Sequence, residues 1–154
     1  HVQLKAMNWL LFEEDDPCRV DMAVIVANPK TGAAEVASGG KIGALVIDAK
    51  GAPRKVVSSQ MPAVGTTKNH EYTGVGLRIV EGETLALFTR GWTAVCNDAG
   101  SPLGEAKFVE TLRDGFGRPA VAAVDELVSD LSAFLKKGRA PDDITLLLVH
   151  RPSG

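Results

Sequence analysis

Two adjacent carboxylates, Asp142 and Asp143, stand directly before an apolar run in the segment APDDITLLLV. Carboxylate oxygens are the ligands that hard cations such as Mg²⁺ and Mn²⁺ prefer, so the pair is a candidate metal site. Neighbouring side chains of a strand point to opposite faces, and therefore only one of the two can enter a given site. Taken alone, the pair is also typical of a turn that begins a strand.

Other side chains with catalytic chemistry are few and scattered. His70 lies in the polar stretch TTKNHEY and His150 in the last apolar run, and the spacing identifies no serine or cysteine partner for either. The nucleophile motif GxSxG is absent, which argues against a serine or cysteine hydrolase. The segment SGGKIG at 38–43 lacks the spacing of a phosphate-binding loop, so we expect the glycines of a tight hairpin there.

The elements that must position these residues follow from the apolar periodicity. A first helix with Leu4, Met7, Leu10 and Leu11 on one face is expected to end before Pro17. About six strands follow in succession, in the segments VDMAVIVAN, AAEVASGG, GALVID, RKVVSS, GVGLRIV and ETLALFTRG. Helices are expected over 104–114 and 119–137, with a final strand after Asp143. Strands first and helices later predict an α+β fold with a largely antiparallel sheet.

The second long helix carries a periodic apolar stripe that predicts a core-facing side. The stripe consists of Val121, Val124, Leu127, Val128, Leu131, Phe134 and Leu135. Gly138 suits the position just after the helix, and Lys136 and Lys137 suit its last turn.

The composition is that of one ordinary globular domain spanning residues 1–154, with 45% apolar and 23% charged residues. A formal net charge of −2 offers no clustered basic surface for nucleic acid or for an anionic membrane. No apolar run is long enough to span a bilayer, and the two cysteines form no metal-binding pattern. We therefore expect a cytoplasmic protein whose cysteines are reduced.

The order of the motifs resembles the C-terminal part of the PPM-type serine/threonine protein phosphatases, and in particular the SpoIIE/RsbU-like branch. That branch reads T-D-G-V-T-E-A-x-N, then a long helix, then D-D-I-T. The resemblance extends over residues 20–152. The matching positions are Thr89, Gly91, Thr93, Asn97, Gly104, Asp142, Asp143, Ile144 and Thr145.

The resemblance implies a two-sheet β-sandwich flanked by helices, with Mg²⁺ or Mn²⁺ at one edge of the sheets. Such paired ions activate a water that attacks a phosphoserine or phosphothreonine. The usual partners are anti-sigma-factor antagonists in bacterial stress and sporulation signalling. The family's N-terminal motifs G-G-D and G-D-x-S-G-H-G, with the strands that carry them, have no counterpart here, and Arg90 replaces the T-D-G aspartate.

Of the metal positions implied by the family, only Asp142 remains, with Asp143 as its neighbour. We therefore expect no bound metal in this site, and Mg²⁺ or Mn²⁺ only if the protein is active. Our hypothesis is that Arg90 takes the place of the cation and forms a bidentate ion pair with Asp142 or Asp143. The alternative is that Arg90 extends into solvent.

Three functions remain open. The first is a catalytically impaired signalling domain, a pseudophosphatase, that binds a protein partner such as an anti-sigma-factor antagonist or a neighbouring regulatory domain. The second is a fragment or divergent member of an active phosphatase, in which Asp98 could substitute as a ligand. The third is a structural or scaffolding domain whose likeness to the phosphatases is coincidental. A sandwich without its first strands also predicts open sheet edges that pair with a second copy or a partner.

Overall fold

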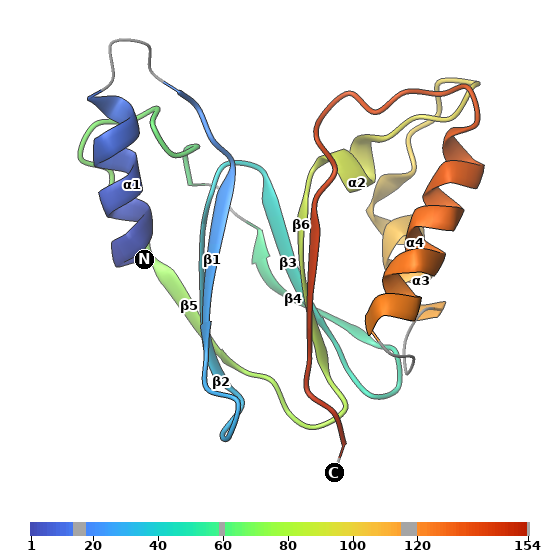
Figure 1. Ribbon diagram of the computed structural model, residues 1–154, viewed down its shortest axis with the longest axis horizontal. Coiled ribbons are helices and arrows are strands. Elements are labelled where there is room, and N and C mark those ends of the chain that lie inside the picture. Colours follow the sequence, from blue (N-terminus) through green and yellow to red (C-terminus); the bar gives the residue numbers. More distant parts are fainter. Residues whose placement is uncertain (14–17, 59–60, 115–119, 154) are drawn as a thin grey trace.

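The computed structural model describes residues 1–13, 18–58, 61–114 and 120–153. Its elements follow one another as expected, with one short added helix, α2 (Figure 1). In chain order they are α1 Val2–Phe12, β1 Met22–Ala27, β2 Ala33–Gly39, β3 Ile42–Ile47, β4 Pro53–Ser58, β5 Gly74–Arg78, β6 Thr84–Thr89, α2 Gly91–Ala94, α3 Gly104–Asp114, α4 Ala120–Leu135 and β7 Leu146–His150.

The strands form two antiparallel sheets, in the orders β1-β2-β5 and β4-β3-β6-β7. Figure 1 shows the two sheets facing each other, with α1 outside the three-stranded sheet and α2, α3 and α4 outside the other. This arrangement confirms the expected α+β sandwich flanked by helices. None of the helices in the described ranges is long and apolar enough to cross a membrane.

Strand β6 shows how the alternation of side chains builds two apolar layers. Leu85 and Leu87 point between the sheets and pack with Val36 and other residues of the facing sheet. The alternate residue Phe88 points toward the helices and packs against Phe108. Each such side chain contributes about 1.5–3 kcal/mol when it is fully buried, so the central strand stabilises both layers at once.

Helix α1 buries only part of the face that its apolar residues predict. Leu4 and Asn8 are buried and Leu11 packs against the same core cluster, whereas Met7 and Leu10 are exposed. The Asn8 side chain donates to the Thr67 carbonyl oxygen and accepts from the Gly65 N–H group. A hydrogen-bonded amide can face the core beside the leucines, and a pattern of apolar residues alone could not predict that Asn8 belongs to the buried face.

Helix α4 ends earlier than expected and exposes part of its apolar stripe. Leu127 is buried, but Val121 and Val128 are 74% and 51% exposed. The chain leaves the helix through Lys136, whose φ is 44°. Gly138 is needed for a close approach, because a Cβ there would lie 2.0 Å from the Cys96 carbonyl oxygen.

The glycines after β2 do not form the hairpin that we expected. Strand β2 pairs with β1 and β5, whereas β3 pairs with β4 and β6, so residues 40 and 41 carry the chain from one sheet to the other. Gly40 has a φ of +83°, and a Cβ there would meet the Asp21 carboxylate at 2.0 Å. This crossing brings the starts of β1 and β3 together at one end of the sandwich.

Candidate functional site

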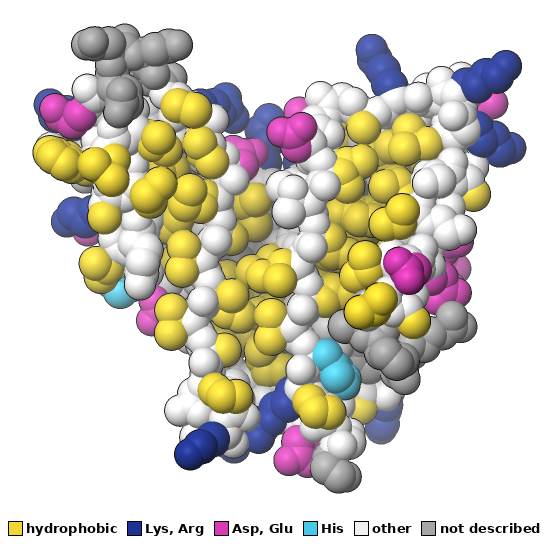
Figure 2. All heavy atoms as spheres, in the orientation of Figure 1, with side chains coloured by type: hydrophobic (Ala, Val, Ile, Leu, Met, Phe, Trp, Pro, Cys, Tyr) yellow, Lys and Arg dark blue, Asp and Glu magenta, His cyan; other side chains and the backbone are white. Residues whose placement is uncertain are grey.

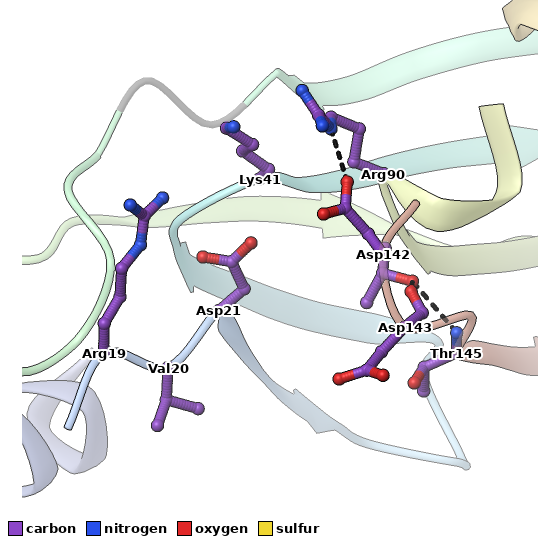
Figure 3. Close-up of a pocket in the computed structure, with 9 residues that line it drawn as sticks. Arg19, Val20, Asp21, Lys41, Arg90, Asp142, Asp143 and Thr145 are labelled. Carbon is purple, nitrogen blue, oxygen red and sulfur yellow. Dashed lines mark hydrogen bonds and ion pairs between the residues drawn. The ribbon is translucent and has the colours of Figure 1, made fainter. Parts of the chain in front are cut away.

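An open cavity of about 570 Å³ lies at this end of the sandwich, where the motif residues converge (Figure 3). It is bordered by the segment before β1, the crossing between β2 and β3, the end of β6 and the loop before β7. The lining residues are Arg19, Val20, Asp21, Lys41, Thr89, Arg90, Asp142, Asp143 and Thr145.

Arg90 and Asp142 form an ion pair across this cavity. The Arg90 Nε donates a hydrogen bond to the Asp142 Oδ2 at 2.8 Å, and the two side chains are 47% and 43% exposed. The pair is made through a single hydrogen bond rather than the bidentate contact that we expected. Figure 3 shows the Asp143 carboxylate turned away from Arg90.

The backbone geometry around Arg90 explains the spacing of the two motifs. The Thr89 hydroxyl donates to the Asp143 carbonyl oxygen at 2.8 Å and accepts from the Thr145 N–H group at 2.9 Å. Gly91 lies so close to the same loop that a Cβ would be 2.2 Å from the Asp143 carbonyl oxygen. Threonine and glycine on either side of Arg90 therefore hold the loop before β7 in place.

Three charged residues that belong to no motif of the sequence share the cavity: Arg19, Asp21 and Lys41. Asp21 directly precedes β1 and Lys41 directly precedes β3. A charged residue at the start of an apolar strand is a signal available in the sequence, but only the crossing between the sheets places these two beside Arg90. Asp98, our candidate for a substitute ligand, is not among the residues that line the cavity.

The residues present do not fit a pair of divalent ions. The three carboxylates of the cavity are accompanied by three cationic side chains, and one carboxylate already pairs with Arg90. Among the described residues, no three His, Cys, Asp or Glu side chains come together in a group that could hold a metal ion. A site for Mg²⁺ or Mn²⁺ needs several oxygen ligands without a competing cation.

A comparison with known protein families identifies the family of this chain. The family described as Stage II sporulation protein E (SpoIIE) matches residues 2–152. A comparison with curated proteins found no match.

Solved phosphatase structures share the fold. The SiaA-PP2C domain of Pseudomonas aeruginosa has a TM-score of 0.77 and 20% identity, covering 96% of this chain and 57% of that one. The phosphatase domain of SpoIIE from Bacillus subtilis has a TM-score of 0.67 and 12% identity, covering 99% and 66%. The RsbU and RsbW domains of a Mycobacterium tuberculosis protein have a TM-score of 0.64 and 21% identity, covering 87% and 37%.

The chain thus spans less than two thirds of the length of each of these three structures. At such identities the likeness establishes the fold, while the family match establishes kinship along almost the whole chain. The family match also overturns the hypothesis that the likeness to the phosphatases is coincidental. The protein belongs to the SpoIIE family, and its fold is that of the PPM-type phosphatase domains.

Proposed function

We propose that this chain is a signalling domain of the SpoIIE family that acts by binding a protein partner and does not hydrolyse phosphoesters. The observation that carries the proposal is the ion pair between Arg90 and Asp142, 2.8 Å apart at the end of β6. By the family pattern a metal-binding aspartate belongs at position 90. An arginine at this position reverses the charge. It also forms an ion pair with Asp142, the carboxylate of the family motif that this chain retains.

The electrostatic cost of placing a metal ion in this cavity supports the proposal. Two unit charges about 4 Å apart interact by about 1 kcal/mol in water and about 4 kcal/mol at an effective dielectric of about 20, and a divalent ion doubles these values. The half-exposed cavity lies between the two limits. Repulsion by Arg90, added to the loss of Asp142 as a ligand, therefore disfavours any divalent ion at this position.

The family supports a protein as the partner. One solved neighbour contains an RsbU and an RsbW domain in the same protein, so a regulatory domain linked to a SpoIIE-type domain has a precedent. We propose an anti-sigma-factor antagonist or a neighbouring regulatory domain as the partner of this chain. The cavity would then serve recognition, with charged side chains of both signs at its rim.

An active phosphatase is the second candidate, and one observation favours it. Asp21 and Asp143 line the same cavity as Asp142 and form no ion pair with any described residue. If the protein contains further residues like those of its longer solved neighbours, additional carboxylates could join these. Arg90 would then have to leave Asp142 before the first ion could bind.

Hydrolysis of p-nitrophenyl phosphate in the presence of Mn²⁺ separates the two candidates. We expect the chain to release no more p-nitrophenol than a blank without protein. The matched variant is Asp143→Asn, which removes one candidate ligand and keeps the shape of the side chain. Turnover by the wild type that this variant abolishes would contradict the proposal and support the active phosphatase.

A further inference from the structure

A second cavity lies among the helices that cover the four-stranded sheet. It has a volume of about 220 Å³ and is lined by residues of α2, α3 and α4, which Figure 1 shows together on the outer side of this sheet. All of the described residues that line it belong to the segment 92–134, so neither sheet contributes to its walls. Among the described residues, none lines both this cavity and the one around Arg90.

The deepest part of this cavity is apolar and aromatic. Trp92, Phe108 and Leu127 line it, are each at most 4% exposed, and belong to the core cluster between the helices and the sheet. The rings of Trp92 and Phe108 lie 5.2 Å apart, with 32° between their planes. Leu131 and Phe134 line the same cavity and are half-buried. Because an apolar cavity of about 150 Å³ is large enough for benzene, this one can take a substituted ring.

The charged residues of the lining make the mouth of the cavity acidic. The Lys107 ammonium donates to the Glu110 carboxylate at 2.9 Å. This hydrogen bond and the negative charges of Glu110, Asp114 and Asp130 raise the pKa of Lys107. Asp114 lies 3.9 Å from Arg113, whereas Asp130 forms no ion pair with any described residue. The one cation of the lining is therefore already neutralised, and the Asp130 carboxylate is available.

The surface around the mouth has the same sign of charge. Helix α4 contains Asp125, Glu126 and Asp130 but no lysine or arginine. Figure 2 shows acidic side chains gathered over α4, on the right of the view. A patch of one sign raises the local concentration of ligands of the opposite sign, so this surface attracts cations and disfavours anions.

We propose that this cavity binds a small organic cation, with an apolar body against the aromatic lining and an ammonium group paired with Asp130. Aromatic side chains favour an aromatic body, because offset and edge-on ring contacts add to the burial of apolar surface. The ammonium group stays at the exposed mouth and thus avoids the cost of burying a charge. The proposal does not depend on whether the cavity around Arg90 binds a protein or hydrolyses phosphoesters.

Titration of benzylamine into the ¹⁵N-labelled protein, followed by NMR, tests the proposal. Benzylamine is a cation at neutral pH, benzyl alcohol has nearly the same shape without the charge, and benzoate carries the opposite charge. Saturable binding of benzylamine should move the indole N–H resonance of Trp92 and leave that of Trp9, which is 58% exposed on α1, in place. Benzylamine should bind at least about fivefold more tightly than benzyl alcohol, and benzoate most weakly.

Asp130→Asn tests the ion pair without changing the shape of the side chain. It should raise the dissociation constant of benzylamine about fivefold and leave that of benzyl alcohol within about twofold. Asp125→Asn is the matched control, because Asp125 is exposed on the same helix and is not among the described residues that line the cavity. Equal affinities for the three probes, or an effect of Asp130→Asn no larger than that of Asp125→Asn, would overturn the proposal.

A cavity-filling variant tests where the apolar body lies. Leu131→Phe enlarges a side chain of the lining and should weaken the binding of benzylamine and benzyl alcohol alike. Val128→Phe is its control, because Val128 is 51% exposed on the same helix and is not among the described lining residues. Circular dichroism should show all four variants folded. If Leu131→Phe binds benzylamine as tightly as Val128→Phe does, or if benzylamine leaves the Trp92 resonance unmoved, the cavity is not the binding site.

Discussion

Replacing Thr89 with valine should loosen the loop that carries Asp142 and Asp143 while preserving the shape of the side chain. The Thr89 hydroxyl donates to the Asp143 carbonyl oxygen and accepts from the Thr145 N–H group. A net hydrogen bond contributes about 0.5–1.5 kcal/mol, and water can reach this partly exposed site, so Thr89→Val should cost about 1–2 kcal/mol of unfolding free energy. For a chain of this size, that corresponds to a melting temperature lower by about 2–8 °C.

Urea denaturation followed by circular dichroism measures this difference. Thr111→Val is the matched control, because the Thr111 hydroxyl donates only to the Lys107 carbonyl oxygen of its own helix. Such a bond on an exposed helix surface adds little, and the control should lie within about 0.5 kcal/mol of the wild type. If Thr89→Val destabilises the protein no more than Thr111→Val does, the hydroxyl does not hold the loop and our account of the motif spacing fails.

Two further changes test the packing of α1 and the turn between β3 and β4. Asn8→Ala should cost about 2–4 kcal/mol in urea denaturation, because it leaves the Gly65 N–H and Thr67 carbonyl groups without their partner; a cost below about 1 kcal/mol would mean that water replaces the amide. Backbone N–H groups of Ala52 and Lys50 lower the pKa of Asp48, so its ionised form stabilises the fold above its unfolded pKa of about 3.9 and this stabilisation is lost as the pH falls. Asp48→Asn should therefore lower the melting temperature near neutral pH, and this loss should shrink as the pH is lowered further below about 3.9; a loss that stays the same at every pH would contradict this assignment.

Local patterns were sufficient to predict most of the elements of this fold. Alternating apolar residues located the strands, and the 3.6-residue period located α3 and α4, because both signals depend on neighbours in the sequence. The assignment of strands to sheets depends on distant contacts. Strands β5 and β6 are joined by a short turn, yet they pair with β2 and β3 in different sheets.

The candidate site was predictable only in part for the same reason. Arg90 and Asp142 were identified because the family motif marks their positions, and the structure brings them within 2.8 Å. Arg19, Asp21 and Lys41 belong to no motif, and they share the cavity because the crossing at Gly40 places the start of β3 beside the segment before β1. The valines of α4 were assigned to the core because a helical period cannot tell which of two adjacent faces is covered.

Calorimetric titration of Mn²⁺ into the wild type and into Arg90→Asp tests the claim that the guanidinium of Arg90 takes the place of an ion beside Asp142. The wild type should give no binding heat above the dilution blank, whereas Arg90→Asp should bind Mn²⁺ weakly, because it removes the positive charge and frees the Asp142 carboxylate. Binding of Mn²⁺ by the wild type that is as tight as, or tighter than, that by the variant would contradict the claim.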